Sequence, residues 1–295
     1  MKLQRFNGSG GVTLTADVGG HPSRPAVVLL HGGGQTRHSW NKFAHRLVRL
    51  NYYVVSLDLR GHGDSDWALD GDYRLDAFVA DLHGVLGQLQ QPPVLIGASL
   101  GGLISLLAVG EHPRKVVAQG LVLVDVVPRM EAIGLRRIQE FMRANLDGFA
   151  TLEEVAAVVS AYLPQRAKPP NPDGLRKNVR LAEDGRWYWH WDPALVTSDR
   201  RLGGSVDRQR LWLAARQVQL PTLLVHGKLS DVVSREGVDD LLALIAGAQA
   251  VEVNGAGHMV AGDQNDAFND AIEHFLSVSP ESAVNRSGNS RDASV

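Results

Sequence analysis

The segment Val94-Leu95-Ile96-Gly97-Ala98-Ser99-Leu100-Gly101-Gly102-Leu103 joins an apolar, strand-like run to an apolar helical segment over residues 103–109. It contains the pattern Gly-x-Ser-x-Gly, in which a serine occupies a sharp strand-to-helix turn. Such a turn holds the serine in a strained conformation and leaves room only for small residues two positions away, and Gly97 and Gly101 satisfy this. We therefore predict that Ser99 lies at the tip of a strand-to-helix turn and is a candidate nucleophile.

Outward from this turn, strand-like and helix-like segments alternate. The predicted strands cover residues 3–6, 12–17, 26–30, 52–57, 94–96, 121–124, 222–225 and 250–253, and the first two read as a hairpin. The predicted helices cover residues 43–50, 75–89, 103–109, 238–245 and 267–276. This alternation predicts an α/β fold, a mostly parallel sheet with helices on both faces.

Residues 129–217 break the alternation. This segment contains a Pro-rich joint at 169–172 and an aromatic patch at 187–191, and residues 129–216 hold 15 basic and 11 acidic side chains. We interpret 129–217 as an inserted helical cap, or lid, over a core formed by 1–128 and 218–279. Residues 280–295 are polar and aperiodic, which predicts a C-terminal tail.

Composition excludes several classes of function. The chain has 295 residues, a formal net charge of −2 and no cysteine. A nearly neutral protein lacks the positive field that holds nucleic acid or anionic lipid, so neither is expected as a partner. Without cysteine there is no disulfide, thiolate metal site or cysteine nucleophile. No signal-peptide pattern, membrane-length apolar run, metal motif or nucleotide motif is present, so we expect a cytoplasmic protein with no membrane association, metal or cofactor.

Two further groups follow predicted strands and complement Ser99. The glycine-rich run His31-Gly32-Gly33-Gly34 comes directly after strand 26–30, where the backbone N–H groups of Gly33 and Leu100 would form an oxyanion hole. Asp231 and His258 lie just beyond strands 222–225 and 250–253. Because the carboxyl ends of parallel strands meet at one edge, Ser99, Asp231 and His258 are predicted to act as nucleophile, acid and base.

Together these motifs resemble those of the α/β-hydrolase superfamily. The resemblance rests on residues 31–34, 58–65, 97–102 and 257–258, and is strongest to its bacterial esterase, epoxide-hydrolase and cofactor-free haloperoxidase-like branch. It implies an eight-stranded sheet, a helical lid and hydrolysis without a cofactor. A serine at position 99, where epoxide hydrolases have aspartate, points to acyl transfer.

The position of the acid departs from the pattern of many members. A Gly-x-x-Asp run would place the acid at Ser230, whereas this chain has Asp231 one residue later. Some members use the position after an earlier strand, which corresponds here to Asp125. We favour Asp231 and keep Asp125 as the reserve acid.

The leading hypothesis is a serine hydrolase that cleaves a small, largely apolar ester, thioester or lactone through an acyl-enzyme. Its partner would be a small-molecule acyl substrate, and the chain would be a monomer or a homodimer. Two alternatives remain: hydrolysis of a carbon–carbon bond in a ketone-bearing acid, and a hydrolase-fold receptor for a small ligand with weak turnover. Candidate substrate-binding residues are Gly34, Trp40, Trp189 and Trp191. The aromatic patch could equally line the pocket or anchor the cap.

Overall fold

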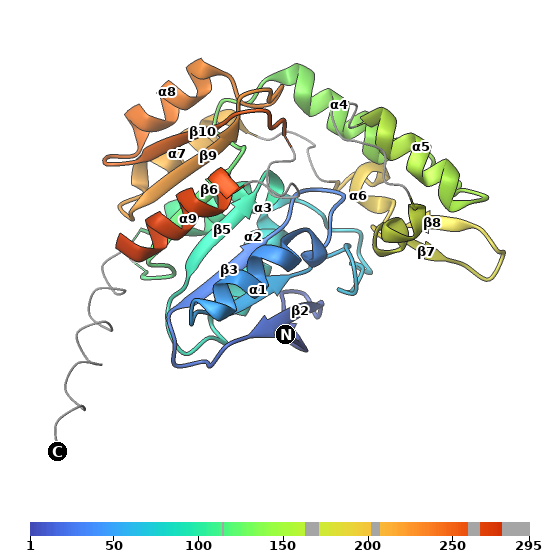
Figure 1. Ribbon diagram of the computed structural model, residues 1–295, viewed down its shortest axis with the longest axis horizontal. Coiled ribbons are helices and arrows are strands. Elements are labelled where there is room, and N and C mark those ends of the chain that lie inside the picture. Colours follow the sequence, from blue (N-terminus) through green and yellow to red (C-terminus); the bar gives the residue numbers. More distant parts are fainter. Residues whose placement is uncertain (114, 163–170, 202–206, 259–265, 279–295) are drawn as a thin grey trace.

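An eight-stranded sheet forms the centre of the computed structural model, which describes residues 1–113, 115–162, 171–201, 207–258 and 266–278 (Figure 1). The strand order is β1-β2-β4-β3-β5-β6-β9-β10. The pairs β1–β2 and β2–β4 are antiparallel and all others are parallel. The bounds are β1 Lys2–Asn7, β2 Thr13–Gly19, β3 Ala26–Leu30, β4 Tyr53–Leu57, β5 Val94–Ala98, β6 Gly120–Val124, β9 Thr222–Gly227 and β10 Gln249–Val253. The mostly parallel sheet predicted from the sequence is confirmed.

Helices cover both faces of this sheet. The 3-10 helix η1 (Arg37–Trp40), α1 (Asn41–Arg49) and α9 (Asp266–Val278) pack on one face, and Figure 1 shows α1 and α9 in front of the sheet. The other face carries α2 (Leu75–Leu86), α3 (Leu100–Gly110), α7 (Arg208–Gln217) and α8 (Arg235–Leu244). Alternate residues of β3 enter the two cores, because successive side chains of a strand point to opposite faces. Within the described ranges, no helix is long and apolar enough to cross a bilayer.

A separate group of elements lies over one end of the sheet (Figure 1). It consists of α4 (Ala132–Arg143), α5 (Leu152–Tyr162), η2 (Pro172–Asn178), β7 (Val179–Leu181), β8 (Trp187–Trp189) and α6 (Ala194–Thr197). The strands β7 and β8 form an antiparallel hairpin, whereas the sequence predicted only helices here. Strands of three residues are too short to show a period of two, which explains the omission.

Helix α7 lies within the segment that the sequence assigned to the cap, but it packs against the core. A Cβ atom at Gly110 of α3 would lie 2.2 Å from the carbonyl oxygen of Ala214, so the two helix backbones are in direct contact. Arg210 of α7 also pairs with Glu111 at the end of α3, over 2.6 Å. We infer that the cap ends before α7. The predicted tail, 280–295, lies outside the described residues.

Candidate active site

Ser99 occupies the turn between β5 and α3, as predicted. Its backbone has φ +47° and ψ −111°, a conformation that costs a non-glycine residue about 1–3 kcal/mol. The surrounding backbone leaves no room for larger neighbours: a Cβ atom at Gly97 would lie 2.3 Å from the carbonyl oxygen of Gly101, and one at Gly101 would lie 2.5 Å from that of Leu30. The Ser99 N–H donates to the carbonyl oxygen of Val124 over 2.9 Å, which ties the turn to β6.

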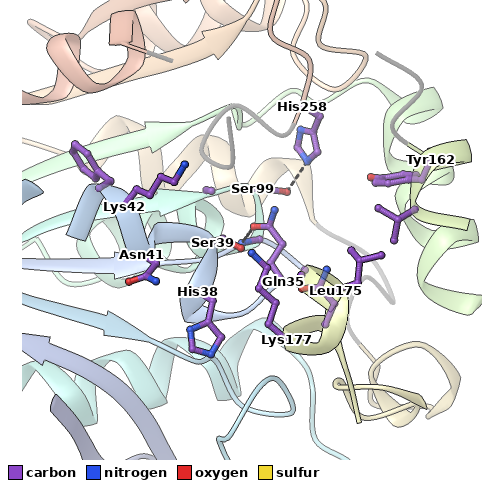
Figure 2. Close-up of a pocket in the computed structure, with 18 of the residues that line it drawn as sticks. Gln35, His38, Ser39, Asn41, Lys42, Ser99, Tyr162, Leu175, Lys177 and His258 are labelled. Atoms are coloured by element: carbon purple, nitrogen blue, oxygen red, sulfur yellow. Dashed lines mark hydrogen bonds between the residues drawn. The ribbon is translucent and has the colours of Figure 1, made fainter. Parts of the chain in front are cut away.

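Three side chains form a continuous hydrogen-bonded chain at this turn. Nε2 of His258 lies 3.1 Å from Oγ of Ser99 (Figure 2), and Nδ1 of the same ring lies 2.7 Å from Oδ2 of Asp125. Because an ionised carboxylate can only accept, Nδ1 carries the proton and Nε2 is free to accept from the serine hydroxyl. The His258 side chain is 5% exposed and that of Asp125 is fully buried. The histidine is therefore held in the orientation and tautomer that a general base requires.

Asp125 is fixed from several directions. It follows β6 with φ +51°, and its N–H donates to the carbonyl oxygen of Val225 over 2.8 Å. Its Oδ1 accepts from the Gly227 N–H over 2.9 Å, and its Oδ2 accepts from the Ser230 hydroxyl over 2.6 Å. Hydrogen bonds to the charged form stabilise an ionised carboxylate in a buried position.

The prediction that Asp231 is the partner of His258 is wrong in this structure. Asp231 points to the cap, where its two carboxylate oxygens each lie 3.1 Å from the guanidinium of Arg137 on α4. A Cβ atom at Gly134 of α4 would lie 2.4 Å from the Asp231 carbonyl oxygen, so the cap helix packs closely on this loop. Asp125 follows β6, and Asp231 lies in the loop after the adjacent parallel strand β9. Only the three-dimensional course of this loop shows which of the two carboxylates reaches His258.

The glycine-rich run after β3 presents a backbone donor to the cavity. The Gly32 carbonyl oxygen accepts from Nδ1 of His31 over 2.8 Å and from the Gln35 N–H over 3.1 Å. In a trans peptide the carbonyl and the following N–H point in opposite directions, so the Gly33 N–H is directed away from these two donors. Among the described residues, neither the Gly33 nor the Leu100 N–H donates a hydrogen bond, which leaves both for a ligand.

Three buried histidines support this loop. Nε2 of His62 accepts from the Gly34 N–H over 3.2 Å, and Nδ1 of His190 accepts from the Gly63 N–H over 2.9 Å. Nε2 of His190 lies 3.4 Å from the Gly34 carbonyl oxygen. Burial lowers the pKa of His31 to about 4 and that of His62 to about 3, and it lowers the pKa of His190 well below the usual value. All three rings are therefore neutral, and those of His62 and His190 can accept the hydrogen bonds from the Gly34 and Gly63 N–H groups.

The sequence analysis did not identify His190 as a residue of the site. His190 lies between Trp189 and Trp191, and in the sequence this histidine reads as part of an aromatic patch. The structure shows that the rings of Trp189 and Trp191 stack on each other, with centroids 4.6 Å apart and an interplanar angle of 11°. Nothing in the local sequence indicates that the intervening histidine contacts a loop more than a hundred residues away.

A cavity of about 880 Å³ opens above Ser99 (Figure 2). Three of the candidate substrate-binding residues from the sequence analysis line this cavity, namely Gly34, Trp189 and Trp191. Trp40 does not, which contradicts its prediction as a substrate-binding residue. It is fully buried in the core and stacks on Phe268, with ring centroids 6.3 Å apart. In the part of the chain that the structure describes, no group of three histidine or carboxylate side chains is arranged to hold a metal ion.

The fold and the hydrogen-bonded triad are those of an α/β-hydrolase, and sequence comparison agrees. The model of the alpha/beta hydrolase family matches residues 27–271, and the chain belongs to this family. It is 30% identical to Esterase Rv0045c of Mycobacterium tuberculosis over 86% of this chain and 83% of the esterase. It is 31% identical to the mouse sn-1-specific diacylglycerol lipase ABHD11, over 87% of this chain and 82% of the lipase.

Solved structures show the same architecture. An alpha/beta hydrolase from Novosphingobium aromaticivorans superposes with a TM-score of 0.80 at 25% identity, covering 94% of this chain and 98% of that one. The protein is therefore a hydrolase of this family, and its relatives support ester hydrolysis at the level of the family.

Proposed function

We propose that this protein is a serine hydrolase that cleaves a small, largely apolar ester, thioester or lactone through an acyl-enzyme on Ser99. The observation that carries the proposal is the chain of hydrogen bonds from Ser99 through His258 to Asp125 at the floor of the cavity. A serine hydroxyl is a weak nucleophile, and a neutral histidine nitrogen 3.1 Å away is the base that activates it.

In the first half-reaction, Nε2 of His258 takes the hydroxyl proton as Oγ of Ser99 bonds to the substrate carbonyl carbon. The carbonyl oxygen becomes an oxyanion, which the N–H groups of Gly33 and Leu100 stabilise. The tetrahedral intermediate then collapses. The bond to the leaving oxygen or sulfur breaks, the leaving atom takes the proton from His258, and the acyl group stays on the serine.

Water completes the cycle by the same steps in reverse. His258 removes a proton from a water molecule, whose oxygen attacks the acyl carbon. When the second tetrahedral intermediate collapses, Oγ of Ser99 leaves with the proton from the imidazolium. Asp125 stabilises that imidazolium in both halves and keeps the ring from turning away from the serine.

The cavity walls support an apolar acyl group as the substrate. The cap contributes aromatic and aliphatic side chains, among them Phe141, Val159, Trp189 and Trp191. A volume of about 880 Å³ suits a small-molecule ligand, and burying each methylene against such walls stabilises binding by about 0.8 kcal/mol.

Labelling with a fluorophosphonate probe tests the proposal directly. The purified protein should be labelled, and Ser99→Ala should abolish both labelling and the hydrolysis of short-chain p-nitrophenyl esters. Ser105→Ala is the matched control, because Ser105 lies on α3, the helix that follows Ser99, but its hydroxyl is buried and donates to the Gly101 carbonyl oxygen. This control should keep the label.

The outcomes also separate the alternatives. Labelling without ester hydrolysis would favour one of the two alternatives, a carbon–carbon bond hydrolase or a ligand receptor. Turnover of a vinylogous diketone would establish the hydrolase. The absence of labelling in the wild-type protein would mean that Ser99 is not activated, and the proposal would be wrong.

A further inference from the structure

The cavity above the serine has an apolar side and a cationic side. Its apolar lining comes largely from the cap, with Ile138, Phe141, Val159, Leu175, Trp189 and Trp191. The positive charge comes from two other places: α1 contributes Lys42, Arg46 and Arg49, and η2 contributes Lys177. Figure 2 shows Lys42 and Lys177 among the side chains around the cavity.

The cations of α1 form a stripe along one face of the helix. Positions 42, 46 and 49 are spaced four and three residues apart, so these side chains lie above one another. The opposite face carries Phe43 and Leu47, which are buried against the sheet. Like charges at this spacing weaken a helix rather than stabilise it. Arg46 and Arg49 lie in the last turn of α1, where a cation stabilises the helix dipole, so helix stability explains these two positions but not Lys42.

Most of this charge has no neutralising partner. Arg46 donates to Asp270 over 3.1 Å and to Glu273 over 2.9 Å. Lys42, Arg49 and Lys177 are exposed, and no carboxylate among the described residues forms an ion pair with them. The described lining holds a single carboxylate, that of Asp266. A protein with a net charge of −2 thus concentrates positive charge at this cavity.

Building on the function proposed above, we propose that the substrate is an acyl ester or thioester whose alcohol or thiol portion carries negative charge, as a carboxylate or a phosphate. The orientation of the substrate follows from which lining residues are buried and which are exposed. Trp189 and Trp191 are buried, so the apolar acyl group lies beneath the cap. Lys42, Arg49 and Lys177 line the same cavity and are exposed to solvent, so the charged leaving portion lies on this exposed side. Cations that line a cleft attract such a group and hold it there.

Two matched pairs of substrates test the inference. The first pair is 4-carboxyphenyl butyrate and the neutral 4-carbamoylphenyl butyrate, which share the acyl group and nearly the same shape. The second pair is S-butyryl-4′-phosphopantetheine and the neutral thioester S-butyrylpantetheine, which differ only in the phosphate. Each exposed ion pair makes only a small contribution, so three cations together should raise kcat/KM for the charged member about tenfold. The first pair reports recognition of a carboxylate, and the second reports recognition of phosphate.

The variant Lys42→Glu/Lys177→Glu removes two of the cations and reverses their charge. We expect the ratio of kcat/KM, charged over neutral substrate, to fall to about one or below in each pair that shows a preference. Lys2→Glu/Arg5→Glu is the matched control. This control changes the net charge by the same amount, but on β1 at the edge of the sheet. It should keep the wild-type ratio of kcat/KM for charged over neutral substrate. The wild-type preference should also shrink between about 20 and 300 mM NaCl, because salt screens exposed charges.

A binding measurement keeps the inference testable without turnover. Ser99→Ala should bind the charged ester more tightly than its neutral partner, as followed by intrinsic tryptophan fluorescence, because Trp189 and Trp191 line the cavity. Equal kcat/KM and equal Kd within both pairs would overturn the inference, as would a preference that survives in Lys42→Glu/Lys177→Glu.

If neutral esters are hydrolysed without a charge preference, only this inference fails. If Ser99 is not labelled and no ester is hydrolysed, the proposed function fails, while the Kd comparison still decides the charge preference.

Discussion

The hydroxyl of Ser230 lies 2.6 Å from Oδ2 of Asp125, the same carboxylate oxygen that accepts the hydrogen bond from His258. Ser230 occupies the position at which many α/β-hydrolases carry their acid. Here that position supplies a hydroxyl donor, and the acid comes from the end of the neighbouring strand β6. The next residue, Asp231, is engaged with Arg137 of the cap. This arrangement leads to the first two predictions.

Asp125→Asn should lower kcat by about three to four orders of magnitude, because an amide neither stabilises the imidazolium nor holds the required tautomer. Asp231→Asn is the matched substitution one position beyond Ser230 and should change kcat by less than about threefold, since its ion pair with Arg137 is partly exposed. Ester hydrolysis by the two variants, measured side by side, checks this. A large loss of kcat in Asp231→Asn alone would restore Asp231 as the acid.

A carboxylate at position 230 should partly replace that of Asp125. In the double variant Asp125→Ser/Ser230→Asp, the new carboxylate enters the space that the shortened residue vacates, within reach of Nδ1 of His258. We expect kcat to rise about 10- to 100-fold above that of Asp125→Ser, a recovery of about 1.4–2.8 kcal/mol in transition-state stabilisation. Asp125→Ser/Ser230→Asn has the same shape without the charge and should show no recovery. Equal rates in the two double variants would refute the prediction.

The buried histidines predict a loss of stability at mildly acidic pH. In the folded protein the pKa of His62 is about 3 and that of His31 about 4, both below the value of 6.5 expected after unfolding. The unfolded chain therefore binds more protons, and stability present above pH 6.5 is lost as the pH falls towards the folded values. Between pH 7 and 5.5 each such histidine should cost about 1 kcal/mol of unfolding free energy.

Urea denaturation at the two pH values measures this loss. His62→Gln is the informative variant, because its amide oxygen can still accept from the Gly34 N–H but does not titrate. Its change in unfolding free energy between pH 7 and 5.5 should be about 1 kcal/mol smaller than that of the wild type. An unchanged pH dependence would show that His62 is not kept neutral by burial.

Gly97→Ala should destabilise the fold by about 3 kcal/mol or more, because the added Cβ would lie 2.3 Å from the backbone oxygen of Gly101 and neither segment can move away. Gly174→Ala is the control: nothing lies within 4 Å of a Cβ at that position, and its effect should stay within about 0.5 kcal/mol. Thermal unfolding of both variants provides the comparison. Equal melting temperatures would mean that the turn around Ser99 is looser than the structure shows.

Much of the core could be predicted from the sequence because its signals are local. The all-apolar run of β3 indicates a strand buried on both faces, and its predicted bounds, 26–30, match the structure. The turn at Ser99 is encoded by the two glycines beside it, and His258 comes directly after a predicted strand. Each of these predictions uses neighbours within a few residues along the chain.

The sequence by itself determined the strand–helix alternation, the turn that carries Ser99 and the edge of the sheet at which the site forms. Only the tertiary structure decided that Asp125 rather than Asp231 meets His258, that Trp40 belongs to the core, and that His190 supports the loop around Gly34. These contacts join segments about 130 to 230 residues apart. Their geometry depends on how strands, loops and cap pack in space, and no periodicity or spacing along the chain encodes it.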